Sequence, residues 1–500
     1  MRAVLLAVAL LLLANFSFAP VASAAGVVTV CDETHLRSAL SGGGTVRFAC
    51  SGVIVLSAEI VIAADTAIDG GMQNVTISGG GVVRVFTVTP GTAFSLRRIT
   101  VADGRALKGG GIFVPDCYVA CGDTTLVIDD SIFTHNHATR WGGGLFLSTY
   151  CQEECGRVAV AVSNSVFDAN TAGSAGAAIF HDSDSYPQQI ALTISDSGFE
   201  NNTGDVIVPG NSARMTVQNS VFSNNAGNAI IAALYSFTFT SVSGSVFAGN
   251  SGNGLTSREW GAAQVNDSGF YSNGGCGISN WDSQLSVRDS TFANNGECGI
   301  ESGDDGGVAT IIGSTFSNNG DAGRDIVSGV QGVVTVANST LVNRGGSNIG
   351  GLSAGYESVV HVINSTLYGV PVISYLPEST IVFTNTIAAN SSTGVNCTGL
   401  IVDGGGNISY PDATCPGINA DPLLGALGNY GGSTQTMVPS WDSPAVDGAV
   451  DSACLTAPIS GLDQRWMMRP IGVHCDIGAV EFASVLPWRK WLPVMLMRNE

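Results

Sequence analysis

Short stretches of alternating apolar and polar residues run through most of the chain, and one pattern recurs among them. The pattern is Ser, any residue, Phe, any two residues and Asn, as at 220–225. Alternation with a period of two predicts β-strands, and the Val, Ile, Thr, Ser, Gly and Asn of the repeat argue against helices. The apolar marker of the pattern falls at Phe133, Phe167, Phe199, Phe222, Phe247, Phe270, Phe292, Phe316, Leu341, Leu367 and Ile387.

The spacing of these copies predicts the architecture. The first two steps are 34 and 32 residues, and the later ones are 20 to 26 residues. A unit of about 22 to 25 residues has room for three short strands and three turns, which is one coil of a solenoid. We therefore predict an all-β fold, a right-handed parallel β-helix of roughly a dozen coils. The first three coils, between Gly111 and Phe199, are longer by about ten residues each, which predicts loops that project from one end of the rod.

The pattern also assigns each position a face. Ser at −2 and Phe at 0 share a strand face, and the larger apolar group should point inward. Stacked coils would then build an aromatic column. We expect Asn at +3 to lie at a bend, with left-handed backbone angles, and to hydrogen-bond the Asn of the next coil.

The two ends of the chain differ from the repeats. Residues 1–24 contain Arg2, an apolar run and Ala22-Ser23-Ala24, which predict a signal peptide cleaved near Ala24. Residues 25–66 should form an N-terminal cap and the first strands, with a helix from Cys31 to Leu40 capped by Asp32. Strands are predicted at 45–48, 53–56, 60–62 and 66–69. The repeats occupy 67–396, a C-terminal domain 397–482, and a Leu-Pro-rich tail 483–500.

Two segments resemble known families. "GGGTVRFACSG", "TAIDGG" and "RRITVADGRALKGGG" between Cys31 and Gly111 resemble the start of secreted bacterial right-handed β-helix repeat proteins. "DGGGNISYPDATC", "NADPLLGALGNYGGSTQTMVP" and "GLDQRWMMRPIGVHCDIGAVEF" resemble the choice-of-anchor Q domain. That resemblance implies a β-rich C-terminal cap that closes the helix, not a catalytic domain. The family usually has Gly after Asp-Gln-Arg, where this chain has Trp466.

Charge and cysteine content indicate the compartment. The formal net charge is −20 and only Lys108 and Lys490 are lysines, so nucleic acid is not an expected partner. No stretch after the signal is long enough to span a bilayer. We predict a secreted or cell-surface protein. An even number of cysteines fits disulfides there, and the twelve are Cys31, Cys50, Cys117, Cys121, Cys151, Cys155, Cys276, Cys298, Cys397, Cys415, Cys454 and Cys475.

The spacing of the cysteines predicts one disulfide clearly and leaves another set of pairings open. Cys276 and Cys298 each lie six residues after a marker Phe, which predicts a bridge between neighbouring coils. The cysteines of the two Cys-x3-Cys pairs could instead pair within each loop or between stacked loops.

The loops of the long coils are the candidate ligand site. Each has a Tyr, which suits sugar rings, and nearby carboxylates that would suit a calcium ion. No other metal or cofactor is predicted, and tolerated insertions are the alternative explanation. The candidate ligand-binding residues are Tyr118, Tyr150, Glu153, Glu154, His181, Asp182, Asp184 and Tyr186.

The functional prediction is a non-enzymatic β-helix protein that displays loops to bind glycans, matrix or cell-envelope components. The alternative is a polysaccharide lyase or glycoside hydrolase. If the chain is such an enzyme, Asp168 and Glu200 are the best catalytic candidates, because both follow a marker Phe in successive copies. An enzyme of this kind should also have a basic residue beside an acidic cluster, and the sequence reveals none.

Overall fold

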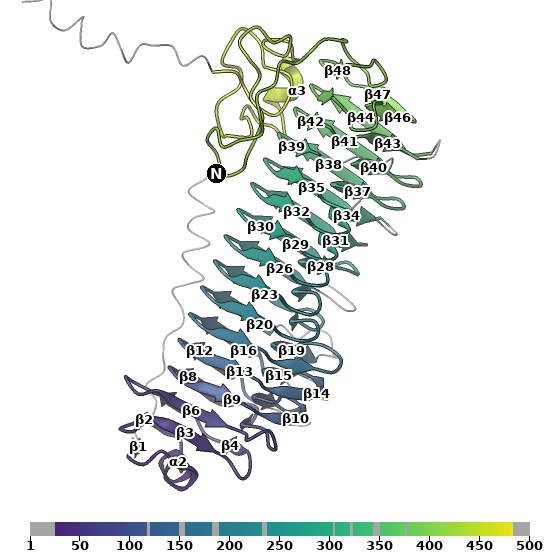
Figure 1. The fold of residues 1–500 in the computed structure, drawn as a ribbon. Helices are drawn as coiled ribbons and strands as arrows, with labels where there is room; N and C mark the ends of the chain where they lie inside the picture. The colour runs from purple at the N-terminus through teal and green to yellow at the C-terminus, as the bar shows by residue number, and fades with distance from the viewer. Residues whose placement is uncertain are drawn as a thin grey trace, which may run out of the picture. The chain divides into compact units, whose positions relative to one another are not determined.

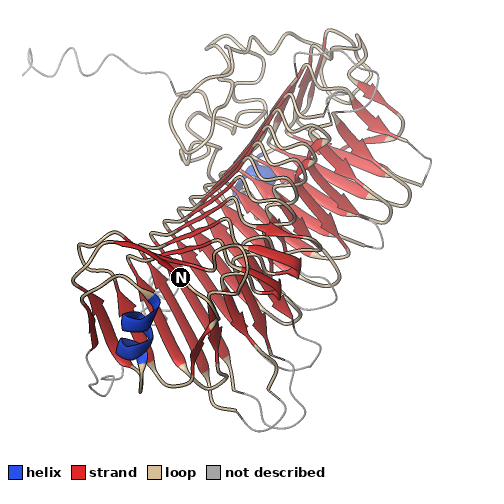
Figure 2. Cartoon of the chain, turned by 60° about the horizontal axis from the view of Figure 1, so that its bottom comes forward, coloured by secondary structure: helices blue, strands red, loops and turns tan. Residues whose placement is uncertain are grey.

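A computed structural model describes residues 26–117, 121–149, 156–182, 190–232, 238–303, 306–320, 324–343, 351–375 and 378–483. The chain forms two compact units. The first runs to Gly173 and includes Ala177–Ala191, and the second comprises Ser174–Gly176 and the chain from Leu192 onward. Strand β20 (Ile190–Ser195) crosses from the first unit into the second. Each unit is built from short strands in parallel sheets, as Figures 1 and 2 show.

The first unit contains three parallel sheets, named A, B and C, and a small additional sheet, named D. Sheet A contains β1 (Gly26–Val28), β2 (Gly44–Phe48), β5 (Thr66–Asp69), β8 (Ala93–Arg97), β12 (Thr124–Asp129) and β16 (Val158–Ser163). Sheet B contains β3 (Gly52–Val55), β6 (Val75–Ser78), β9 (Thr100–Ala102), β13 (Ile132–Thr134) and β17 (Val166–Asp168). Sheet C contains β4 (Ile60–Ile62), β7 (Phe86–Val88), β11 (Ile112–Val114), β15 (Leu145–Ser148) and β19 (Ile179–Asp182). Sheet D contains β10 (Arg105–Lys108), β14 (His137–Trp141) and β18 (Thr171–Ala172).

The second unit continues the same three-strand coil. Its sheet A strands are β23 (Arg214–Gln218), β26 (Phe239–Ser243), β29 (Ala262–Asn266), β32 (Gln284–Arg288), β35 (Val308–Ile312), β38 (Val333–Ala337), β41 (Val359–Ile363), β44 (Thr380–Thr384) and β47 (Ile401–Asp403). Its sheet B strands are β21 (Gly198–Glu200), β24 (Val221–Ser223), β27 (Val246–Ala248), β30 (Gly269–Tyr271), β33 (Thr291–Ala293), β36 (Thr315–Ser317), β39 (Thr340–Val342), β42 (Thr366–Tyr368), β45 (Ile387–Ala389) and β48 (Ile408–Tyr410). Its sheet C strands are β22 (Ile207–Val208), β25 (Ile230–Ile231), β28 (Leu255–Ser257), β31 (Cys276–Trp281), β34 (Cys298–Gly303), β37 (Ile326–Ser328), β40 (Leu352–Ala354), β43 (Val372–Ser374) and β46 (Cys397–Thr398).

The predicted fold is confirmed: the chain is an all-β, right-handed parallel β-helix. The marker residues are buried and stack in register from coil to coil. In the second unit, neighbouring rings from Phe199 to Phe316 lie 4.7–4.9 Å apart between centroids and are tilted by only 3–5°. In the first unit, Phe133 and Phe167 stack at 4.8 Å. The interior aromatic column therefore follows from the repeat.

Ser and Asn of the repeat form the predicted inward ladders. The Ser220 hydroxyl donates to the Gln218 carbonyl and accepts the backbone N–H of Ser197. The Asn225 amide donates to Asn250 Oδ1 at 2.8 Å and to the Phe199 carbonyl at 2.9 Å. These bonds satisfy polar groups that would otherwise be costly in the interior.

One detail of the repeat differs from prediction. In the coils with a Phe marker the left-handed residue is at +2, not at the Asn of +3, as at Asn224 with φ of 55°. The amide of Asn225 must point inward to reach Phe199 and Asn250, so the backbone reverses one residue earlier.

The N-terminal cap is the predicted amphipathic helix. Helix α2 (Glu33–Leu40) begins after Asp32, whose side chain accepts the backbone N–H of His35. Leu36 is completely buried, and Ala39 lies so close to Gly26 of β1 that a Cβ there would collide with it. Figure 2 shows this helix at the end of the first unit's strands. It covers apolar surface of the first coil, as a solenoid end requires.

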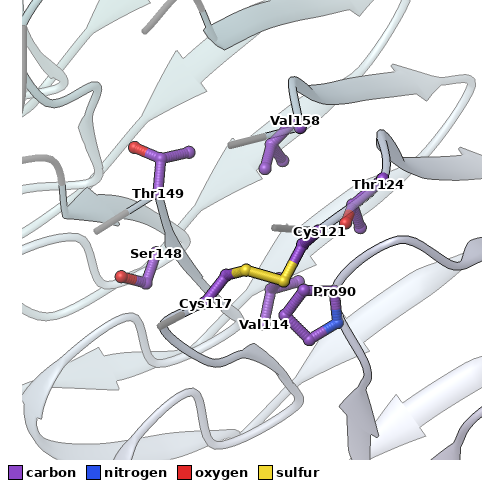
Figure 3. A pocket seen from close by; sticks show the side chains of 10 residues that line it. Pro90, Val114, Cys117, Cys121, Thr124, Ser148, Thr149 and Val158 are labelled. Carbon is purple, nitrogen blue, oxygen red and sulfur yellow. A yellow bond between two sulfur atoms is a disulfide. The ribbon is translucent and has the colours of Figure 1, made fainter. Parts of the chain in front are cut away.

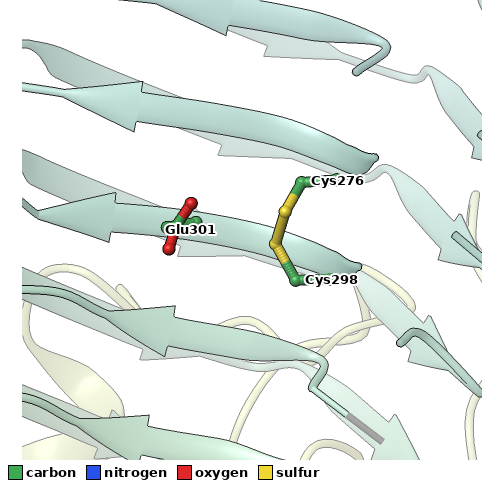
Figure 4. Close-up of side chains that lie close together, drawn as sticks. All are labelled: Cys276, Cys298 and Glu301. Carbon is green, nitrogen blue, oxygen red and sulfur yellow. A yellow bond between two sulfur atoms is a disulfide. The ribbon is translucent and has the colours of Figure 1, made fainter. Parts of the chain in front are cut away.

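Five disulfides link described cysteines, and three of the pairs are Cys31–Cys50, Cys397–Cys415 and Cys454–Cys475. Cys276 and Cys298 face each other in β31 and β34 and form the predicted bridge between coils (Figure 4). Cys117 pairs with Cys121, so this loop is closed upon itself rather than joined to the next. Cys151 and Cys155 lie outside the described residues.

The C-terminal segment differs from a β-rich end cap. Residues 411–483 contain the short helix α3 (Asp451–Leu455) and isolated bridges rather than strands. Ile418 continues the ladder beyond β48 and covers that strand edge. The remainder lies along the outer face of the last coils, beside strands β39 and β42 (Figure 1).

Polar contacts fix this segment to sheet B. Gln464 accepts a hydrogen bond from the Thr340 hydroxyl at 2.6 Å and donates to Thr315 Oγ1 at 3.1 Å. Arg469 forms a completely buried ion pair with Glu481 and also donates to Asn338 Oδ1. The Asp-Gln-Arg stretch thus acts in docking the segment onto the outward Thr ladder. Within the described residues, no helix has the length and apolar character needed to cross a membrane.

Candidate functional site

The strongest cluster of functional groups lies on the outer face of sheet C in the first unit, beside sheet D. Inward and outward residues alternate along β11, β15 and β19, so one face supplies the core and the other this cluster. Phe113, Phe146 and Phe180 are in register on the outward face. Their ring centroids are 5.5 and 5.7 Å apart, which gives a second aromatic row outside the core.

Lys108 at the end of β10 lies against this row. Its Nζ is 4.6 Å from the Phe146 ring centroid, 5.0 Å from that of Trp141, and 3.3 Å from Asp182 Oδ2. The side chains of Lys108 and Asp182 remain 27% and 34% exposed, so solvent reaches the pair. The structure thus places a basic residue, Lys108, beside an acid, Asp182, an arrangement that the sequence analysis did not find. Nothing in the sequence signals it, because Lys108 and Asp182 are 74 residues apart.

Local structure fixes the position of Lys108. The pairing of β10 with β14 is irregular between Ala106 and Lys108, and such bulges often redirect a side chain. Arg84 donates to the carbonyls of Lys108 and Gly109 at 3.0 and 2.9 Å, and its guanidinium lies 4.3 Å from the Phe113 centroid. Glu59 pairs with Arg84 and completes the support.

Further cations lie next to Trp141, whose ring is partly exposed. The guanidinium of Arg140 is 5.3 Å from the Trp141 centroid, and Arg105 is on the adjacent strand of sheet D. Both arginines are exposed and neither has a carboxylate partner among the described residues. On the other side, Asp116 accepts a hydrogen bond from Ser148, which is in register with Asp182. Aromatic, basic and acidic groups therefore share one face.

His181 does not belong to this face, although it directly precedes Asp182. It is in register with inward Leu147 and is buried, where it contacts Thr149 Oγ1 at 2.9 Å. Burial lowers the pKa of His181 to about 3, so the imidazole is neutral. His181 and Asp182 are successive strand residues and point to opposite faces, so they do not face one common ligand.

The other predicted site residues are not brought together by the described structure. Asp168 and Glu200 are partly buried on β17 and β21, which belong to different units, so their pairing stays a prediction. The remaining candidates lie outside the described residues, namely Tyr118, Tyr150, Glu153, Glu154, Asp184 and Tyr186.

Two clusters of metal-binding residue types occur among the described residues. They are Cys276, Cys298 and Glu301 (Figure 4), and Asp451, Cys454 and Cys475. In both, the two cysteines are joined in a disulfide and offer no thiolate. Neither cluster is a credible metal site.

A small hollow lies beside the Cys117–Cys121 bridge, lined by residues such as Pro90, Val114 and Ser148 (Figure 3). Its volume of about 20 Å³ is enough for roughly one water molecule. This hollow is therefore too small for a ligand of sugar size.

Comparisons with known proteins bear on the fold. A family model described as a right handed beta helix region matches residues 177–341. No curated protein matches the chain.

Three solved structures are similar at low identity. They are tailspike protein 3 of bacteriophage CBA120, at 13% identity and a TM-score of 0.36, the A-module of mannuronan C-5 epimerase AlgE6 from Azotobacter vinelandii, at 13% and 0.36, and pectate lyase Pel9A, at 14% and 0.34. The matches cover 77%, 77% and 89% of this chain. They cover 59% of the tailspike chain, 91% of the epimerase module and 98% of the lyase.

Proposed function

We propose that this protein is exported and binds an acidic polysaccharide, outside the cell or at its surface, without cleaving it. The observation that carries this is the outward cluster of Lys108, Asp182 and Trp141, with Arg140 beside them. A partly exposed indole suits the apolar face of a sugar ring, and an unpaired guanidinium suits a sugar carboxylate. Asp182 would accept hydrogen bonds from hydroxyl groups.

Charge supports an anionic ligand at this position. The chain carries a formal charge of −20, so a local group of basic side chains is unusual on its surface. Arg105, Lys108 and Arg140 lie on two adjacent strands of sheet D. Lys108 contacts an acid and two π faces, which hold its ammonium group at this surface.

Export and attachment rest on sequence features together with the disulfides. The apolar N-terminal run ending in Ala22-Ser23-Ala24 supports secretion, and paired cysteines suit an oxidising compartment. The resemblance of the C-terminal segment to the choice-of-anchor Q domain supports a role in presenting the β-helix at the cell surface.

Binding to polygalacturonate and alginate, compared with a neutral glucan, tests the proposal. We expect the wild type to be retarded in affinity gels that contain either polyuronate. The double variant Lys108→Gln/Arg140→Gln should bind at least tenfold more weakly. Arg157→Gln is the matched control, because Arg157 is also an exposed arginine of the first unit. Equal binding by the folded double variant would exclude this face.

The same samples separate binding from catalysis. Ultraviolet absorbance of unsaturated products and reducing-end release would reveal a lyase or a hydrolase. We expect neither signal during prolonged incubation. Product formation that depends on Lys108 would replace the binding proposal with the enzymatic alternative.

A further inference from the structure

A row of exposed aromatic side chains follows the turns that leave sheet C in the second unit. Trp260 comes after β28, Tyr356 after β40 and Tyr375 after β43. These side chains are 65%, 43% and 51% exposed. They occupy equivalent turns of different coils, so the solenoid aligns them along one edge. This edge belongs to another unit than the Lys108 cluster.

Two of the exposed rings have an acid beside them. The indole N–H of Trp260 donates to Asp282 of the next coil, and the Trp260 backbone has a φ of 64°. A left-handed conformation is strained for so bulky a residue, and such strain often marks a functional position. Tyr356 interacts with the carboxylate of Glu357, which also accepts a hydrogen bond from Gln331 at 2.8 Å.

One register position at this edge is aromatic in one coil and glycine in the next three. Trp281, in register with Arg258, has the guanidinium of that residue 4.6 Å from its ring centroid. In the following coils the equivalent positions are Gly303, Gly329 and Gly355. A Cβ on Gly303 would lie 2.3 Å from Gly329 Cα, so the close packing of these coils requires glycine. At these three described positions no side chain projects from the edge.

Charge defines the class of chain that would fit. Glu259, Asp282, Glu357 and Glu378 lie in these turns, whereas Arg258 is already stacked on Trp281. Uronate carboxylates would be repelled by such an edge, while neutral hydroxyl groups can donate to the acids. Coils rise by about 4.8 Å each, so Trp260 and Tyr356, four coils apart, are separated by about 19 Å along the edge. That length requires several sugar units rather than one.

We propose that this edge of the second unit is a track for an extended, neutral polysaccharide chain, with Trp260, Tyr356 and Tyr375 as stacking platforms. The proposal goes beyond binding of an acidic polysaccharide at the Lys108 face, because the unit, the residues and the ligand charge all differ. It makes the protein a candidate bridge between two kinds of glycan.

Isothermal titration with cello-, xylo- and manno-oligosaccharides of two and six sugars tests the track. We expect at least one six-sugar ligand to bind at least tenfold more tightly than its two-sugar counterpart. The variant Trp260→Ala/Tyr356→Ala should lose at least tenfold in affinity for it. The control Trp441→Ala/Tyr430→Ala removes two aromatic residues that are 76% and 44% exposed outside this edge, and should bind like the wild type.

Three results would overturn the track. They are no binding of any of the neutral oligosaccharides, equal affinity for two and six sugars, or undiminished binding by the folded Trp260→Ala/Tyr356→Ala variant. Binding to polyuronates is measured in parallel and should be unchanged in that variant. If that variant loses binding of neutral oligosaccharides but keeps binding of polyuronates, the track is supported independently of the Lys108 face.

Discussion

The Phe residues of the repeat are interior, and those within the column have rings stacked on both sides. Phe222 is completely buried, and its neighbours Phe199 and Phe247 lie at centroid distances of 4.7 and 4.9 Å. Val221 precedes it on the same strand but is 40% exposed. The two adjacent residues therefore test the inward register directly.

Phe222→Ala should lower the free energy of unfolding by about 3–5 kcal/mol, because it removes buried apolar area and leaves a cavity. Val221→Ala should change it by less than about 1 kcal/mol, since only a partly exposed strand position is altered. Chemical denaturation of both variants measures the difference. Equal losses would contradict the assignment of faces.

The Asn ladder ends on an acid. Asn319 donates from its amide to Asp325 Oδ1 at 2.8 Å, where another Asn would continue the series. Asp325 is buried, and its Oδ2 has no hydrogen-bond partner among the described residues. Burial raises the pKa of Asp325 to about 7, despite the two hydrogen bonds from Asn319.

The raised pKa predicts how stability depends on pH at this residue. The folded protein holds the Asp325 proton more tightly than the unfolded chain, so the stabilisation is complete below about pH 4 and is lost as pH rises through about 7. Asp325→Asn removes this term. Its stability relative to wild type should therefore increase between pH 5 and pH 8 in denaturant melts. Parallel pH profiles of the two proteins would contradict the prediction.

At the level of elements, the C-terminal segment is fixed by buried polar contacts. Arg469 and Glu481 are both inaccessible to solvent and 2.8 Å apart, and the Arg469 guanidinium also donates to the Gly478 carbonyl. Removing one partner of such a pair leaves the other charge buried without a counterion, which is destabilising. Trp466 of this segment has a φ of 70°, a left-handed conformation that suits glycine better than a bulky residue. Trp466 compensates in part by donating to Asp289 at 3.2 Å.

Arg469→Met should destabilise the C-terminal segment by about 3–5 kcal/mol, because Glu481 is left charged and buried. Adding Glu481→Gln should recover part of the loss by removing that charge. Chemical denaturation followed by tryptophan fluorescence, to which Trp441 and Trp466 contribute, measures the loss. Arg97→Met is the control, since the exposed pair Arg97–Asp129 should contribute less than about 1 kcal/mol. A similar effect of both single variants would refute the docking argument.

The sequence repeat predicted those contacts that recur from one coil to the next. Stacking of Phe222, bonding of Asn225 to Asn250, and the Cys276–Cys298 bridge all follow from equal offsets in successive copies. The contact of Lys108 with Asp182 does not, because it depends on a bulge in sheet D and on three coils of unequal length. Side-on docking of Gln464 was equally hidden, since its Thr ladder reads as ordinary strand residues.

For the whole molecule, disulfides supplement the stacking of coils. A coil contacts only its neighbours, so a bridge between coils restricts separation at that point. Cys276–Cys298 encloses 22 residues and joins β31 to β34, whereas Cys117–Cys121 closes only a local loop. The two bridges should therefore contribute unequally to stability.

The double variant Cys276→Ser/Cys298→Ser should lose about 3 kcal/mol of unfolding free energy, the value expected for a loop of this size. Cys117→Ser/Cys121→Ser should lose less. Peptide mapping without reduction should first recover Cys276 linked to Cys298 and Cys117 linked to Cys121. A free thiol at Cys276 or Cys298 in the oxidised protein would contradict the bridge.

The scarcity of lysine gives the ion pair of Lys108 a practical consequence. Besides the terminal amine, Lys108 and Lys490 are the sole primary amines of the chain, and Lys490 lies outside the described residues. Acylating reagents must compete with Asp182 and with the rings of Trp141 and Phe146 for the Lys108 nitrogen. Its rate of modification, followed by mass spectrometry, is then a native footprint of one surface. A polyuronate that covers this amine would slow its labelling without any engineered tag or dye.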